Sequence, residues 1–168
     1  LDTMASFEHW DQLLPKVVSD HMKYKGHYVA VPVNVHRVNW LWASNAVLQK
    51  AGVAAAPKTW DEFFAAADKV KAAGLVAVAH GGQDWQDYTT FESVVLGVGG
   101  PKLYQDALMK LERDALASDE MRRALQVFRR IKGYVDDGSK GRDWNVATDM
   151  VIKDRAAFQF LGDWAKGE

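Results

Sequence analysis

The chain has 168 residues, 48% of them hydrophobic, which is enough to bury one core, so a single domain is expected. Its 21 Lys and Arg nearly balance its 22 Asp and Glu, and the net charge of -1 argues against partners selected mainly by charge, such as nucleic acid. Because the chain has no cysteine, it can form no disulfide, thiolate nucleophile or cysteine-based zinc site.

No apolar run approaches the roughly 20 residues that a membrane-spanning helix needs. The N-terminus "LDTMASFEHW" lacks the basic start and apolar core of a signal peptide. If the protein is exported, we expect its signal to lie outside this chain.

The first distinctive segment, "VPVNVHRVNWLW", follows the pattern of a buried β-strand within residues 28–43. Asn34 and His36 interrupt this apolar run with an amide and an imidazole. Trp40 and Trp42 come at its end, where packing is the simpler expectation. The two polar residues are therefore the ones that need a functional explanation.

A helix is predicted over residues 60–73, because Thr59 and Glu62 have the spacing of a capping box and Gly74 follows as a left-handed C-cap residue. The short run "LVAVAHGG" then reads as a strand. A second capping box, Thr89 with Glu92, predicts the start of the next helix, and "LGVGG" at residues 96–100 predicts its end rather than a phosphate-binding loop.

Helical spacing of apolar residues continues in "SDEMRRALQVFRRIKGYV", with arginines on the opposite face. The apolar positions are Met121, Ala124, Leu125, Phe128, Ile131 and Val135. After the polar turn "DDGSKGRD", a helix is predicted in "WNVATDMVIKD" with Asp143 as N-cap, and a strand in "AAFQFLG". Helices and strands alternate, so we predict an α/β fold.

Known catalytic and metal motifs are poorly matched. Lys140 takes the place of an oxygen ligand in the one segment that resembles a calcium loop, and no histidine pair has metal-binding spacing. Two carboxylate pairs, Asp84 with Asp87 and Asp163 with Glu168, leave a glycosidase as an alternative. We expect no metal, no cofactor and no enzyme activity.

Tryptophan is frequent, with seven residues, and three of them follow polar residues near the ends of predicted elements: Trp85, Trp144 and Trp164. Core tryptophans usually lie inside periodic runs. A pyranose presents a C–H face that stacks on an aromatic ring, and hydroxyls that need donors and acceptors such as Gln, Asn and Asp. This pattern favours a sugar site.

Three stretches resemble the sugar-binding proteins of bacterial ABC importers, with the strongest likeness to glucose-binding proteins and a more distant one to maltose-binding protein. They are "GHYVAVPVNVHRVNWLWASNAVLQKAG", "PKTWDEFFAAADKVKAAGLVAVAHGGQDWQD" and "AAFQFLGDWAKGE". The resemblance implies one lobe of a two-lobed, type II-like periplasmic-binding fold that closes on a sugar and docks on a membrane permease. It also implies a periplasmic or extracellular location.

By this resemblance, the substrate-binding residues are expected to be Asn34, His36, Gln83, Trp85, Trp144, Asp163 and Trp164. Residues 28–43 would lie near the hinge, and a monosaccharide, with glucose favoured, would be the ligand. A sugar-recognition module without a transport role remains a second alternative.

Members of the family are much longer, so we expect residues 1–168 to form mainly the second lobe. A part of the cleft keeps stacking surface but loses opposing hydrogen bonds, so weak or absent sugar binding is expected. Strands without partners would also leave open edges, which predicts self-association of the chain.

Overall fold

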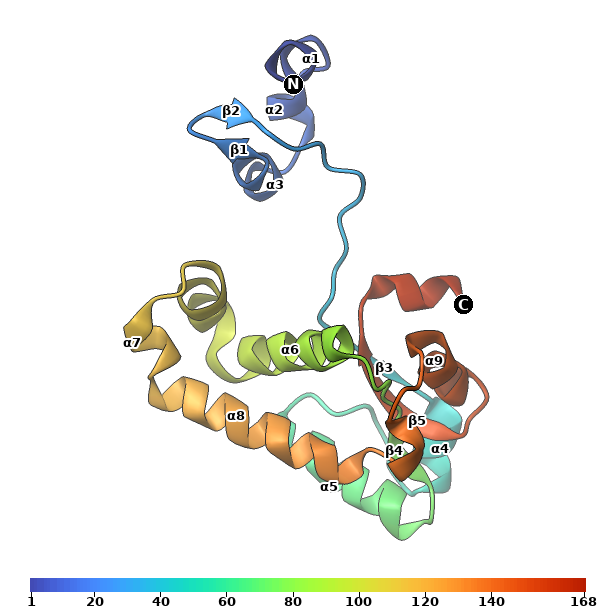
Figure 1. Cartoon of the computed structure of the whole chain (residues 1–168). Coiled ribbons are helices and arrows are strands. Elements are labelled where there is room, and N and C mark those ends of the chain that lie inside the picture. The colour runs from blue at the N-terminus through green and yellow to red at the C-terminus, as the bar shows by residue number, and fades with distance from the viewer. The chain divides into compact units, whose positions relative to one another are not determined.

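The computed structural model describes all of residues 1–168 and divides them into two compact units, residues 1–36 and residues 37–168 (Figure 1). The expectation that residues 1–168 form mainly one lobe stays a prediction.

The first unit, residues 1–36, is small and was not anticipated as helical. Its elements are α1 (Asp2–Phe7), α2 (Trp10–Leu13), α3 (Lys16–His21), β1 (Lys23–Tyr24) and β2 (His27–Tyr28). Tyr28 is its anchor: the ring packs edge-on against Trp10 at 5.1 Å, and the hydroxyl donates to Asp11 Oδ1 at 2.8 Å. Asp2 accepts the Tyr28 backbone N–H and so joins the hairpin to α1.

The second unit contains a three-stranded sheet in the order β3 (Trp40–Ala43), β5 (Ala156–Leu161), β4 (Val76–Val78). β5 pairs antiparallel with β3 and parallel with β4. All six residues of β5 are buried, which agrees with its position between the other two strands. The mixed sheet with its surrounding helices confirms the predicted α/β class.

Figure 1 shows α6 and α8 packed alongside each other. This unit has ten helical segments, of which one is π-helical and the other nine are α- or 3₁₀-helical. Their bounds are α4 (Asn45–Lys50), α5 (Trp60–Ala72), α6 (Asp84–Leu103), α7 (Arg113–Leu116), α8 (Asp119–Ile131), α9 (Trp144–Ile152) and the shorter η2 (Lys132–Tyr134), η3 (Asp137–Ser139) and η4 (Asp163–Gly167). A π-helical segment, η1 (Tyr104–Met109), follows α6. None of the helices combines the length and the apolar character required to span a bilayer.

The core of the second unit is built where α5 packs on β5. Phe63 lies 5.1 Å from Phe158 and 5.4 Å from Phe160, ring centre to ring centre, and the three rings are at most 6% exposed. Trp60, at the start of α5, stacks on Phe160 at 5.8 Å. The predicted helix over residues 60–73 is therefore confirmed to within one residue, with Thr59 as its cap.

Three sequence expectations need correction, and the first concerns residues 28–43. After Tyr28, which ends β2, only Trp40–Ala43 forms a strand there, because regular pairing with β5 begins at Trp40. The valines from Val29 to Val35 are exposed, up to 93% at Val33, so most of the apolar run is not buried.

The second correction concerns the capping box assigned to Thr89 and Glu92. α6 begins five residues earlier, at Asp84, and the Thr89 hydroxyl donates to the Trp85 carbonyl oxygen inside the helix. The third concerns α8, where Leu125 is 51% exposed and Val135 lies beyond the helix end. The helix end predicted at residues 96–100 is confirmed, since Gly100 leaves helical geometry with φ +68° and a new turn begins at Pro101.

Candidate functional site

The candidate site lies in the second unit, where the chain leaves β4 and β5. These parallel neighbours end at the same edge of the sheet, the edge at which open α/β sheets usually bind ligands. The chain after β4 passes Gln83 into α6, and the chain after β5 passes Gly162 into η4. The two exits thereby place Trp85 and Trp164 at one location.

The Trp85 and Trp164 indoles lie 6.1 Å apart, centre to centre, and are inclined by 52°. Trp85 keeps 40% of its surface exposed, whereas Trp164 is partly buried. Gly162 makes room for the second ring, because a Cβ at this position would lie 2.0 Å from a Trp164 ring carbon. The pair offers an aromatic surface against which the C–H face of a sugar could stack.

Gln83 organises the polar side of this site. Its Nε2 donates to Asp143 Oδ1 at 2.9 Å, and its Oε1 accepts from Trp85 Nε1 at 2.9 Å and from the buried Gln86 at 3.1 Å. Both ends of the Gln83 amide therefore have protein partners. The geometry makes Gln83 the residue that orients the Trp85 ring, in addition to any contact with a ligand.

Asp143 was predicted only as a helix cap, and its side chain makes no cap hydrogen bond. It holds Gln83 instead, which links the start of α9 to the start of α6. Trp144, the next residue, is partly buried, and its carbonyl oxygen accepts from Gln159 of β5 at 3.3 Å. No local pattern identifies Asp143 as a site residue, because its partner lies 60 positions away.

Asp163 is tied to the chain that enters β3. Its Oδ2 accepts the Arg37 backbone N–H at 3.1 Å, and its own N–H donates to the Arg37 carbonyl oxygen at 2.9 Å. Trp42 donates to the carbonyl oxygens of Leu161 and Gly162, and it stacks on Trp40 at 5.1 Å. The expectation that these two tryptophans are packing residues agrees with this arrangement.

The seven predicted site residues thus fall into different parts of the chain. The structure brings Gln83, Trp85 and Trp164 into contact, and it places Trp144 next to the Gln83 partner Asp143. Asn34 and His36 are exposed members of the first unit, in a segment without regular secondary structure. Their role remains a prediction from the resemblance.

Charged groups behind the site are paired within the protein. Arg142 makes two hydrogen bonds to Asp136, at 2.8 and 2.5 Å, and these bonds hold the pKa of the Asp136 carboxyl below its usual range. Arg142 also donates to the His80 carbonyl oxygen, while the His80 ring lies 2.8 Å from Asp87. Asp87 thus has the His80 ring as a structural partner.

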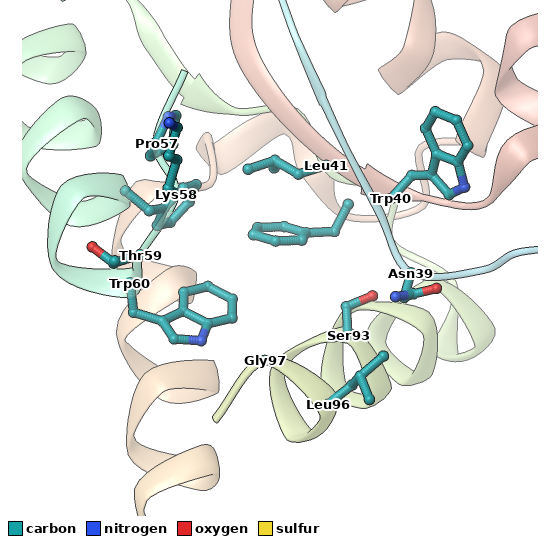
Figure 2. A pocket seen from close by; sticks show the side chains of 12 residues that line it. Asn39, Trp40, Leu41, Pro57, Lys58, Thr59, Trp60, Ser93, Leu96 and Gly97 are labelled. Atoms are coloured by element: carbon teal, nitrogen blue, oxygen red, sulfur yellow. The ribbon is translucent and has the colours of Figure 1, made fainter. Parts of the chain in front are cut away.

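A separate hollow of about 370 Å³ lies between the start of β3, the start of α5 and the middle of α6 (Figure 2). Trp60 lines one side of it and faces Gly97, where a Cβ would approach the indole nitrogen to 3.0 Å. Asn39 and Ser93 lie together at the other side (Figure 2). The hollow does not include the Trp85–Trp164 pair.

Comparison with known proteins agrees with this α/β fold. The sequence profile of the bacterial extracellular solute-binding protein family matches residues 1–168, and the chain belongs to this family. A probable sugar-binding periplasmic protein of Brucella suis is 48% identical over all 168 residues, which make up 39% of that protein. The chain thus spans about two fifths of the length of this relative.

Two solved structures share the fold. A protein described in work on xylan utilization by Caldanaerobius polysaccharolyticus has a TM-score of 0.78 and 26% identity, over 92% of this chain and 39% of that one. The bacterial solute receptor AcbH, described as having an exclusive preference for β-D-galactopyranose, has a TM-score of 0.67 and 27% identity, over 90% and 38%. These likenesses support the predicted kinship with sugar-binding proteins.

Proposed function

We propose that the second unit contributes an aromatic wall to the sugar-binding cleft of a periplasmic receptor that delivers its ligand to an ABC permease. The contact between Trp85 and Trp164, with Gln83 holding the former, is the observation that carries this proposal. A monosaccharide would stack on the rings, with Asp163 and Trp144 at its edge. Sugar contacts by Asn34 and His36, which belong to the first unit, are a separate prediction from the resemblance. The 48% identity to a probable sugar-binding periplasmic protein supports the assignment.

Glucose is our first choice of ligand, from the resemblance of the quoted stretches to glucose-binding proteins. Relatives of the same fold are described with other sugars, including galactopyranose. Epimers differ by the direction of one hydroxyl, so a few hydrogen bonds at the cleft determine the choice. The proposal is therefore tested with several sugars rather than with glucose alone.

The first test follows the indole N–H signals of the chain by NMR during titration with glucose, galactose and maltose. We expect a weak response, with a Kd of about millimolar or higher, because this chain spans two fifths of its relatives and lacks their remaining contacts. Trp85→Ala and Trp164→Ala should each abolish it. Trp40→Phe is the matched control, since Trp40 is 38% exposed against 40% for Trp85.

A sugar response that survives both alanine substitutions would contradict the proposed site. The absence of any response with all three sugars near their solubility limits would contradict sugar binding by this chain. Release of a reducing sugar from an aryl glycoside would favour the glycosidase alternative, and loss of that release in Asp84→Asn or Asp87→Asn would identify its carboxylates.

A further inference from the structure

A second cavity in the same unit, of about 620 Å³, lies between α6, α8 and the loops after β4 and η3. Neither Trp85 nor Trp164 lines it, so it is distinct from the aromatic pair. Its volume is in the range of pockets that hold small organic ligands. Its charge, one buried hydroxyl and its apolar wall together indicate what kind of ligand that is.

Positive charge gathers at this cavity. Arg129, Lys132 and Lys140 line it, and none of the three forms an ion pair. By contrast, Arg122 and Arg123, earlier on α8, pair with carboxylates at 3.1 and 3.2 Å. The one carboxylate in the lining belongs to Asp87, which is already paired with His80. The cavity therefore has an excess of cations, which favours an anionic ligand.

Thr90 supplies an unused hydrogen-bonding group. The residue is 2% exposed, lines the cavity and has a hydroxyl without a hydrogen-bond partner. The hydroxyls of Thr89 and Ser93 on the same helix each donate at 2.9 Å to a carbonyl oxygen four residues earlier, and Thr90 does not. A buried hydroxyl without a partner is costly, and an acceptor atom of a ligand would satisfy it.

The wall formed by the loops is closely packed, which indicates a preformed shape. A Cβ at Gly82 would lie 2.2 Å from the Gly141 backbone nitrogen and 2.5 Å from the Ser139 carbonyl oxygen. At Gly81 it would lie 2.0 Å from the buried Gln86 side chain. Opposite these loops, Phe128, Ile131 and Val135 give the cavity an apolar side.

We infer that this cavity binds a small organic phosphate, with the phosphate among Arg129, Lys132 and Lys140 and the organic part against Phe128. A phosphate monoester carries about two negative charges at neutral pH and several acceptor oxygens, which suits three unpaired cations and one free hydroxyl donor. This inference does not depend on the sugar site.

The test is an NMR titration of the 168-residue chain with phenyl phosphate, inorganic phosphate and glucose. We expect phenyl phosphate to shift the amide signals of Gly81, Thr90 and Lys140, and inorganic phosphate to bind at least several-fold more weakly because it has no apolar part. Equal affinity for the two phosphates would overturn the inference of an organic ligand. The absence of saturable shifts with phenyl phosphate would overturn the site.

Matched variants locate the binding. Lys132→Gln with Lys140→Gln should weaken phenyl phosphate binding about tenfold or more, whereas Lys50→Gln with Arg113→Gln removes the same charge elsewhere and should leave it intact. Thr90→Val should weaken binding several-fold while the unfolding temperature holds or rises, since the unpaired hydroxyl is gone. Binding that is insensitive to the lysine pair, or lost in Trp164→Ala, would place the anion elsewhere and overturn the proposal.

Discussion

Individual side chains in the second unit perform two different tasks. The Gln83 amide forms hydrogen bonds at both ends, to Asp143, Gln86 and Trp85. These bonds fix the Trp85 ring, which stays 40% exposed. Glu92, in contrast, is a buried carboxyl group: it is 6% exposed and forms no ion pair. Burial raises the pKa of the Glu92 carboxyl, because the charged form loses hydration.

Glu92 should therefore destabilise the chain at neutral pH. Because the pKa of Glu92 is higher in the folded chain, the contribution of this carboxyl to stability is fully present below its unfolded-state pKa of about 4.3. This contribution declines as the pH rises through the folded-state pKa. We expect Glu92→Gln to increase the free energy of unfolding at pH 7 by about 1 kcal/mol, and to have little effect near pH 4. Urea unfolding at both pH values measures this difference, and a variant that is less stable at pH 7 would contradict it.

At the scale of elements, local caps determine where some helices begin. The Thr59 hydroxyl accepts the Glu62 N–H at 3.2 Å, and Glu62 accepts the Lys58 N–H at 2.7 Å, so the box closes one residue earlier than its usual pattern. Thr89 and Glu92 have the same spacing but lie inside α6. The chain from Asp84 to Phe91 is already helical, and its tertiary contacts override the local signal.

Loss of the Thr59 cap should cost about 1 kcal/mol of stability, because one N–H at the start of α5 would lose its acceptor. We expect Thr59→Ala to lower the urea midpoint accordingly. Thr59→Ser, which retains the hydroxyl, is the control and should stay close to the parent chain. Equal midpoints for the alanine and serine variants would show that this cap does not stabilise the helix.

At the scale of the whole molecule, the segment between β2 and β3 matters most. Val29, Val31, Val33 and Val35 are between 49 and 93% exposed, and they recur at every second position. An extended segment with one apolar side and few backbone partners can template pairing with another chain. The self-association expected from the sequence therefore has a specific candidate surface.

We expect sedimentation velocity to show a species that grows with protein concentration. Val33→Lys with Val35→Lys should return the chain to a monomer, because charge on this segment opposes pairing. Leu13→Lys with Val17→Lys adds the same charge to other exposed apolar residues, 74 and 63% exposed, and should leave association unchanged. A parent chain that sediments as a monomer at high concentration would contradict the prediction.

The sequence by itself determined the α/β class, the α5 helix with its cap, the β5 strand and the likeness to sugar-binding proteins. These features depend on local pattern: capping residues, periodicity, and the run "AAFQFL", apolar except for Gln159, that suits a central strand. Trp85 and Trp164 were also selected locally, as aromatics beside polar residues.

Only the tertiary structure decided which of these residues meet. The contact between Trp85 and Trp164 arises because β4 and β5 are parallel neighbours, and the bond from Gln83 to Asp143 joins positions 60 residues apart. The division after residue 36 and the cavity beside Thr90 likewise depend on contacts between distant segments. Such contacts cannot be predicted from local sequence, because the residues around a side chain do not indicate which distant residue will contact it in the fold.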